Sequence, residues 1–191
     1  MPRQAQALQR SRTRPRRRSP LRSMDGFACS ALGDVGDWCN TRNEALLAEA
    51  VAPTAVEAGW KLTDGTWESY YDGQEVASAG SLDIEHMVSL AEAFGSGASA
   101  WSTARREAYP NDQGADVSLV AVTACTNRQK ADQDPADWMP RSPEAQWGYA
   151  GEWVATKIRW DLTADDRELE ALKVFAKGPC EDSIVRYAPV V

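Results

Sequence analysis

Helical patterns occur in four parts of the chain. The predicted helices cover residues 40–51, 98–109 and 142–160, and a last helix begins near Thr163. The apolar residues on their faces are Leu46, Leu47, Ala50 and Val51 in the first, Trp147, Ala150, Val154 and Ile158 in the third, and Leu169, Leu172 and Val174 or Phe175 in the last. Such stripes pack against a core, so we expect the aromatic residues of the third helix to be buried.

Strand patterns lie between these helices. Residues 59–73 alternate aromatic and polar side chains around Asp64 and Gly65, a pair typical of a hairpin turn. Residues 116–126 are apolar and rich in β-branched residues, which favours a buried strand.

The segment that follows this strand predicts a turn and then a helix. The turn begins at Asn127, and Asp134 with Pro135 has the pattern of a helix N-terminus. The predicted order is therefore helix, hairpin, strand, helix, strand and further helices, which indicates a small α+β domain.

The segment SLDIEHMVSL predicts a second short strand, in which residue types alternate. Alternation places Leu82, Ile84 and His86 on one face, and Asp83 and Glu85 on the other. His86 is the only histidine of the chain, and a lone histidine on a strand is most often a structural residue. Its neighbour Glu85 and the apolar strand that runs into Asn127, 41 residues downstream, point to chemistry instead.

Composition bounds the classes of protein that are possible. The chain has 191 residues, 43% of them hydrophobic, which is enough for one sizeable core. No apolar run approaches 18 residues and the mean hydropathy is −0.49, so we expect a soluble protein with no membrane partner.

The charge is divided between a basic tail and an acidic body. Residues 1–23 carry eight arginines and no acidic residue, which leaves 13 basic against 28 acidic residues in the remainder. We expect residues 1–23 to be a disordered tail that either neutralises DNA phosphates or is a solvated leader. No apolar segment of a signal peptide follows the arginines, so the sequence as given indicates a cytoplasmic protein, but the location stays open.

Four cysteines leave the redox state open. Cys29, Cys39, Cys125 and Cys180 form no C-x-x-C pair, which argues against a zinc ribbon. They allow three disulfide pairings, and Cys125 could equally be a free thiol in the core.

The segments EHMVSLAEAF and NRQKADQDP together resemble the HNH, or ββα-metal, endonuclease family. The resemblance is to the branch related to the C-terminal domain of GmrSD-type restriction endonucleases, and it extends through CNTRNEALL, GTWESYYDG, GSGASAWSTARREAYPND and WVATKIRWDLT, roughly residues 37–180. It implies that residues 24–191 form a single nuclease domain, in which a two-stranded hairpin and a helix are embedded in additional helices.

The resemblance also implies a set of site residues. His86 becomes the general base, and Glu85 and Asn127 become ligands of one divalent cation, most simply Mg²⁺ or else Mn²⁺. Neutral imidazole can take a proton from water at physiological pH, and the cation stabilises charge on the phosphate and the leaving oxygen.

Further polar residues are candidates for secondary roles. Lys130 either reaches a phosphate or is a solvated lysine, and Arg105 and Arg106 are similar candidates. Asp83 is either a carboxylate that orients the site or a surface residue.

Several residues depart from the family pattern. Trp60 and Trp147 stand where secreted relatives often have cysteine. Glu85 stands in place of an aspartate, and Ser89 in place of a proline. Ser118 replaces the asparagine that pins the two strands together, so that this brace is either missing or supplied by Asn111.

We expect a monomeric, metal-dependent DNA endonuclease with little sequence specificity. An inactive nuclease-like domain that binds DNA is the alternative. A calcium-binding module is suggested by Asp132, Asp134 and Asp137, but the loop lacks the glycine and glutamate of an EF-hand. A role as a toxin or phage-defence effector is compatible with the nuclease interpretation.

Removing residues 1–23 should weaken DNA binding and flatten its dependence on salt. Each neutralised phosphate contributes about 0.9 to the slope of log affinity against log salt concentration. Fluorescence anisotropy of labelled DNA, measured at several salt concentrations, gives both quantities. Catalysis should survive, and an unchanged affinity and slope would show that the arginines are a leader.

Overall fold

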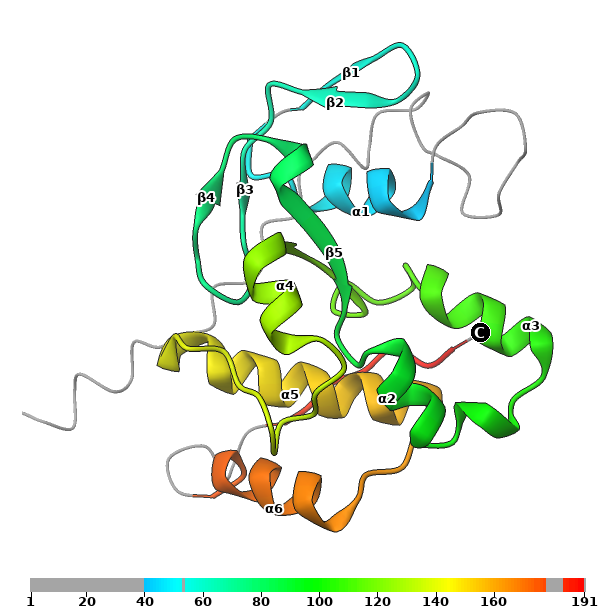
Figure 1. The fold of residues 1–191 in the computed structure, drawn as a ribbon. Coiled ribbons are helices and arrows are strands. Elements are labelled where there is room, and N and C mark those ends of the chain that lie inside the picture. The colour runs from blue at the N-terminus through cyan, green and yellow to red at the C-terminus, as the bar shows by residue number, and fades with distance from the viewer. Residues whose placement is uncertain (1–39, 53, 178–183, 191) are drawn as a thin grey trace, which may run out of the picture.

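The computed structural model describes residues 40–52, 54–177 and 184–190. Within them the chain has the predicted α+β character, with short antiparallel strand pairs among helices (Figure 1). The strand pairs are β1 (Ala55–Glu57) with β2 (Lys61–Thr63), β3 (Trp67–Glu68) with β4 (Glu75–Val76), and β5 (Leu82–His86) with β6 (Leu119–Thr123). The α-helices are α1 (Thr41–Glu49), α2 (Leu90–Gly95), α3 (Thr103–Ala108), α4 (Ala124–Lys130), α5 (Pro143–Trp160) and α6 (Asp166–Phe175).

Several sequence predictions fall outside these residues. The tail at residues 1–23 does, as do Cys29, Cys39 and Cys180. Cys125 is described, and it is exposed and unpaired on α4 rather than buried in the core. In the described ranges, no helix combines the length and the apolar character that a membrane span requires.

The pair β5–β6 separates two hydrophobic clusters. Leu82 lies opposite Thr123 and His86 opposite Leu119, so all five residues of each strand are paired. Alternation along β6 sends Val120 and Val122 into one cluster and Ala121 into the other. The strand predicted from residues 116–126 is therefore buried on both faces.

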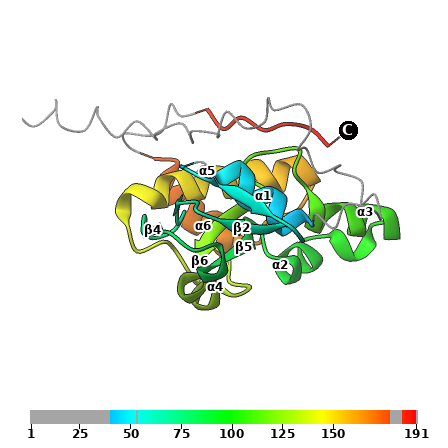
Figure 2. The same ribbon diagram turned by 90° about the horizontal axis from the view of Figure 1, so that it is seen from above.

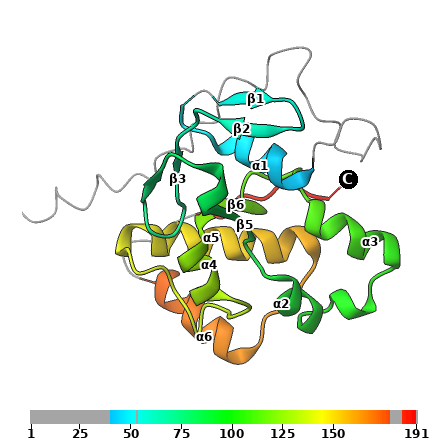
Figure 3. The same cartoon turned by 45° about the horizontal axis from the view of Figure 1, so that its top comes forward.

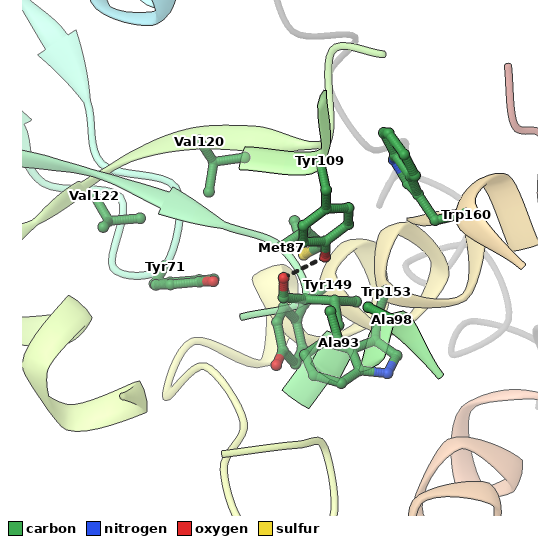
Figure 4. Close-up of a cluster of buried hydrophobic side chains, with 11 residues drawn as sticks. Tyr71, Met87, Ala93, Ala98, Tyr109, Val120, Val122, Tyr149, Trp153 and Trp160 are labelled. Carbon is green, nitrogen blue, oxygen red and sulfur yellow. Dashed lines mark hydrogen bonds between the residues drawn. The ribbon is translucent and has the colours of Figure 1, made fainter. Parts of the chain in front are cut away.

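The two clusters differ in size. The smaller one joins α1 to the strands through Leu46, Ala50, Trp67, Leu82 and Ala121. The larger one is rich in aromatic rings and packs α5 against the other face of the strand pair (Figure 4). Its buried members are Tyr71, Met87, Val88, Ala93, Ala98, Tyr109, Val120, Val122, Tyr149, Trp153 and Trp160. Figure 1 shows α1 on one side of β5, with α5 and α6 on the other.

The helix α5 forms where predicted, but its buried face is displaced. Tyr149, Trp153 and Trp160 lie in the core, whereas Ile158 is exposed. The expectation that aromatic residues of this helix are buried is confirmed for these three. The helix α5 is covered by the strands on one side and by α6 on another, so it buries residues outside the predicted stripe.

A buried lysine links three helices. Lys157 donates hydrogen bonds to Glu92 of α2, at 2.8 Å, and to Glu168 of α6, at 2.5 Å. It also donates to the hydroxyl of Ser96 and the carbonyl of Thr163. This contact buries Glu168 on α6, while the predicted core residue Leu169 is largely exposed.

The hairpin turn predicted at Asp64 and Gly65 is wrong. β2 and β3 flank Asp64 and Gly65 but pair with other strands, so this is not a hairpin turn. A Cβ at Gly65 would lie 2.5 Å from the Thr54 hydroxyl and from the Trp67 ring, so the glycine is needed for close packing.

Asp134 and Pro135 likewise open a turn and not a helix. The backbone N–H of Trp138 donates to the carbonyl of Asp134, and the next helix after α4 begins only at Pro143.

A second polar centre forms around Asp112. Its carboxylate accepts two hydrogen bonds from Arg159, each of 2.7 Å, one from Ser118 and one from the Trp160 indole. Burial raises the pKa of Asp112, but the hydrogen bonds from Arg159, Ser118 and Trp160 outweigh it and hold the pKa below its usual value. Arg159 also donates to the carbonyl of Pro189, in the segment that runs alongside α5 (Figure 2).

Asp112→Asn should lower the free energy of unfolding by about 3–5 kcal/mol at pH 7, because it leaves the buried Arg159 guanidinium without its carboxylate. The folded pKa of Asp112 lies below its usual value of 3.8. Its stabilisation is therefore present above pH 3.8 and is lost as pH falls through the folded pKa. Urea denaturation of wild type and variant at pH 7 and in acid should show curves that converge as pH falls.

The matched control is Asp137→Asn, which removes a carboxylate from a largely exposed pair with Arg167 and should change stability little. A deficit for Asp112→Asn that persists unchanged in acid would contradict the assignment.

Candidate functional site

The strand β5 presents different side chains on its two faces, as predicted. Leu82 and Ile84 belong to the cluster beneath α1. Asp83 and Glu85 point the other way and contact α4. His86 ends the strand, on the face of Leu82, and its ring is half-buried. The candidate base His86 and its neighbour Glu85 therefore lie at one end of β5, with α2 and α3 beyond it (Figure 3).

The helix α4 begins directly after β6. Thr123 is its N-cap, and its hydroxyl accepts a hydrogen bond from the backbone N–H of Thr126. The predicted turn at Asn127 is wrong, because Asn127 lies inside this helix. The helix ends at Lys130, and Ala131 follows with a positive φ of 48°. Asn127 and Lys130 are three residues apart and so share the face that looks toward β5.

Two polar cross-links join α4 to β5. The side-chain amide of Asn127 donates to Oδ2 of Asp83 at 3.0 Å. The ammonium of Lys130 donates to Oε1 of Glu85 at 2.5 Å. The residues of each cross-link are more than 40 positions apart in sequence, so the strand pairing has to form to bring them together.

Lys130 differs from both of its predicted roles. Its side chain has no exposed surface, so it is neither a solvated lysine nor placed to touch a phosphate. Its Nζ lies 5.7 Å from the ring centroid of Trp153, and its carboxylate partner Glu85 is also buried. A buried ammonium needs such a partner because the uncompensated charge is costly to desolvate.

The environment of Glu85 holds the pKa of its carboxyl above the usual value. Burial raises the pKa of Glu85, and Lys130 opposes that shift through its charge and its hydrogen bond. The buried hydroxyls of Tyr71 and Tyr149 have raised pKa values through burial first and the nearby Glu85 charge as a further cause. These tyrosines therefore stay neutral, so they add no charge near Glu85 and Lys130.

The ring of His86 is held by a backbone carbonyl. Its Nε2 lies 3.0 Å from the oxygen of Pro110, and its plane stacks on Tyr109 with 6.2 Å between centroids. A carbonyl oxygen can only accept, so Nε2 must carry the proton, which leaves Nδ1 as the basic nitrogen. Burial lowers the pKa of His86, the Pro110 bond raises it and the Lys130 charge lowers it, with a net decrease. The ring is thus neutral at physiological pH.

The Asp112 centre supports the carbonyl that holds His86. Pro110 lies in the 3-10 turn Tyr109–Asn111, and the carboxylate of Asp112 follows directly. The Ser118 hydroxyl donates to Asp112 at 2.6 Å. The Asn111 side chain accepts from the Thr41 hydroxyl and donates to the carbonyl of Glu107, and the bond from Ser118 to Asp112 is a local contact that does not join β5 to β6.

Ser89 also has a structural role. Its hydroxyl accepts from the backbone N–H of Glu92 and caps α2 directly after the strand end. A proline at this position would lack that hydroxyl.

The two predicted arginines lie on α3. Arg105 is half-buried, donates to the carbonyl of Trp160 at 2.7 Å and stacks on Trp101 at 4.6 Å. Arg106 is exposed and donates to the carbonyl of Trp101. The structure thus engages Arg105 in packing and leaves the DNA role of Arg106 as a prediction.

The oxygen atoms near the cross-links fit a hard divalent cation. Glu85 and Asp83 supply carboxylates, and Asn127 supplies an amide oxygen, which are the ligand types of Mg²⁺. The described residues contain no group of three or more His, Cys, Asp and Glu side chains arranged around one point. A cation at this place would be held by few protein atoms and would complete its shell with water and phosphate.

Sequence reasoning missed two components of the site. The Pro110 carbonyl that orients His86 has no side-chain signal, because any residue supplies a carbonyl. Asp112 directly follows the Tyr-Pro-Asn segment that ends a predicted helix. An acidic residue just after such a turn was the only sequence signal for its role.

Comparison with known proteins shows one family relationship. The chain is 36% identical over 138 residues to an uncharacterized secreted protein of Arthroderma benhamiae, an alignment that covers 72% of this chain and 67% of that protein. The chain belongs to the same family as that fungal protein. No protein-family model matches the chain. No solved structure matches it either.

The single histidine allows a direct test of its tautomer. In the tag-free, ¹⁵N-labelled protein at pH 7, the imidazole of His86 should be neutral with the proton on Nε2, and it should titrate below its usual value of 6.5. Long-range ¹H–¹⁵N correlation spectra over a pH series distinguish the nitrogens by chemical shift. A proton on Nδ1, or titration above 6.5, would contradict the contact with Pro110.

Proposed function

We propose that the protein is a metal-dependent DNA endonuclease of the HNH type. The observation that carries the proposal is the union of β5, β6 and α4, with His86 held in one tautomer beside Glu85 and with Asn127 on the facing helix. On this proposal the three elements are the ββα core that the sequence resemblance implies, and residues 87–118 are inserted between its strands.

His86 is suited to activate water. Its Nε2 proton is bound to the Pro110 carbonyl, so Nδ1 presents a lone pair. Burial keeps this imidazole neutral, and a neutral base can accept the proton that water loses as it attacks the phosphodiester. The imidazolium that forms would then return its proton to solvent.

Glu85 and Asn127 would hold the cation, Mg²⁺ or alternatively Mn²⁺. A divalent cation bound there would supply positive charge for the phosphate oxygens and for the leaving oxygen. Asp83 accepts from the Asn127 amide nitrogen, so it orients this side chain and determines which way its oxygen points.

DNA as the substrate is supported by charge as well as by the site. Residues 1–23 are arginine-rich, and the exposed Arg106 lies on α3, beyond the strand end that carries His86. These groups would bind phosphates without reading bases, which agrees with low sequence specificity. The rest of the chain is acidic, so contact would be confined to such local basic groups.

A second function is favoured by one contact. Lys130 already neutralises the carboxylate of Glu85, and a site in which that neutralised carboxylate holds no cation would bind DNA without cutting it. This inactive, DNA-binding alternative keeps the fold and the tail but predicts no metal-dependent product.

An extracellular location is also proposed, on the basis of the relative. The fungal protein of the same family is described as secreted. An extracellular nuclease would act on DNA outside the cell. In that oxidising environment the cysteines outside the described residues could form a disulfide.

His86→Ala should lower cleavage of supercoiled plasmid by about 10²- to 10⁴-fold while the fold remains intact, because a general base contributes about that much. Wild type and variant are incubated with plasmid in Mg²⁺, Mn²⁺ or EDTA, and nicked and linear products are measured on gels. Circular dichroism checks the fold.

The control is Glu75→Ala, which changes an exposed acid on the edge strand β4 and should cleave like wild type. Near-normal cleavage by folded His86→Ala would remove His86 from the mechanism. Absence of any metal-dependent cleavage by wild type would favour the DNA-binding alternative.

A further inference from the structure

Lys130 is unusual among the lysines of the chain because it is buried against a residue of the candidate site. Its side chain has no exposed surface, whereas lysine is almost never fully buried unless it is paired. Its ammonium donates to Oε1 of Glu85, the residue before His86. A fully buried charge at this position therefore acts on one carboxylate.

The second buried lysine has a different function. Lys157 binds side chains of α2 and α6 and so holds three helices together. Lys130 joins α4 to β5, which already meet through the continuous chain of β6 and α4 and through the bond between Asn127 and Asp83. An apolar side chain against Trp153 would serve packing equally well, so stability alone does not account for the Lys130 charge.

The contact determines how much of Glu85 is available. A carboxylate has two oxygens, and the Lys130 ammonium engages Oε1, which leaves Oε2 for another partner. Calcium ions take six to eight oxygen ligands and readily accept both oxygens of one carboxylate. Magnesium ions take six ligands in a strict octahedron and suit single oxygens together with water.

We propose that Lys130 is a positioning residue that restricts Glu85 to one available oxygen and so makes the site select Mg²⁺ and Mn²⁺ over Ca²⁺. This inference rests on the proposed function, because it takes Glu85 and Asn127 as the cation ligands. Lys130 would not touch the cation or the substrate, and in this role it acts through Glu85.

The test measures metal binding without any cleavage. Binding of Mn²⁺ to the tag-free full-length chain is followed by the electron paramagnetic resonance signal of free Mn²⁺, and Mg²⁺ and Ca²⁺ are added as competitors. Wild type should lose Mn²⁺ to Mg²⁺ at lower concentrations than to Ca²⁺. In Lys130→Met the ratio of the two competitor affinities should shift toward Ca²⁺ by about tenfold, the size of effect typical of a residue that orients a metal ligand.

Lys157→Met is the matched control. It removes the charge from the other buried lysine and disrupts a comparable ion pair with Glu168, but that pair does not involve β5 or α4. Its Mg²⁺ to Ca²⁺ ratio should equal that of wild type, which separates positioning from general loss of stability. Lys130→Leu is measured in parallel in case Lys130→Met does not fold.

The outcomes separate the inference from the proposed function. If Glu85→Gln and Asn127→Ala abolish Mn²⁺ binding but the Lys130 variants keep the wild-type ratio, the role of Lys130 is overturned and the site stands. If wild type itself prefers Ca²⁺, the role of Lys130 is also overturned, whether or not the variants fold. If Mn²⁺ binding is absent, or does not depend on Glu85 and Asn127, the site and the inference both fail.

Discussion

The antiparallel pairing of β5 with β6 is the interaction on which the rest of the structure depends. It places Val120 and Val122 in the aromatic cluster and Ala121 beneath α1. The same alternation directs Asp83 and Glu85 toward α4. A shift of one residue in the register would exchange the faces of every side chain, so the core and the candidate site would be lost together.

The parts of the fold that could be predicted are those encoded by local alternation. The segment SLDIEHMVSL revealed both the strand and its two faces, and the apolar run at residues 116–126 revealed its partner. Helical spacing located α1 and α5, although Val51 and Ile158 of the predicted stripes are exposed. The same alternation predicted that the adjacent residues Glu85 and His86 lie on opposite faces of the strand.

The parts that could not be predicted depend on contacts between distant residues. Nothing near Lys130 in the sequence indicates that it will form a buried ion pair with Glu85, 45 positions earlier. The contact of His86 with the Pro110 carbonyl cannot be predicted from residue type, because every residue has a backbone carbonyl. The need for glycine at position 65 depends on the close approach of Thr54 and Trp67. The Asn127 turn was mispredicted because the cap that starts α4, Thr123, is also the last residue of a strand.

The separation of the two cross-linked segments also determines when the site comes into existence. During synthesis β5 emerges first, and residues 87–118, which include α2 and α3, are made before β6 and α4. Contacts across 44 and 45 positions close later than local helices do, because the entropy of the intervening loop opposes them. A nascent or prematurely terminated chain therefore carries His86 and Glu85 without Asn127 and Lys130, so the chain that is still being made holds no complete site.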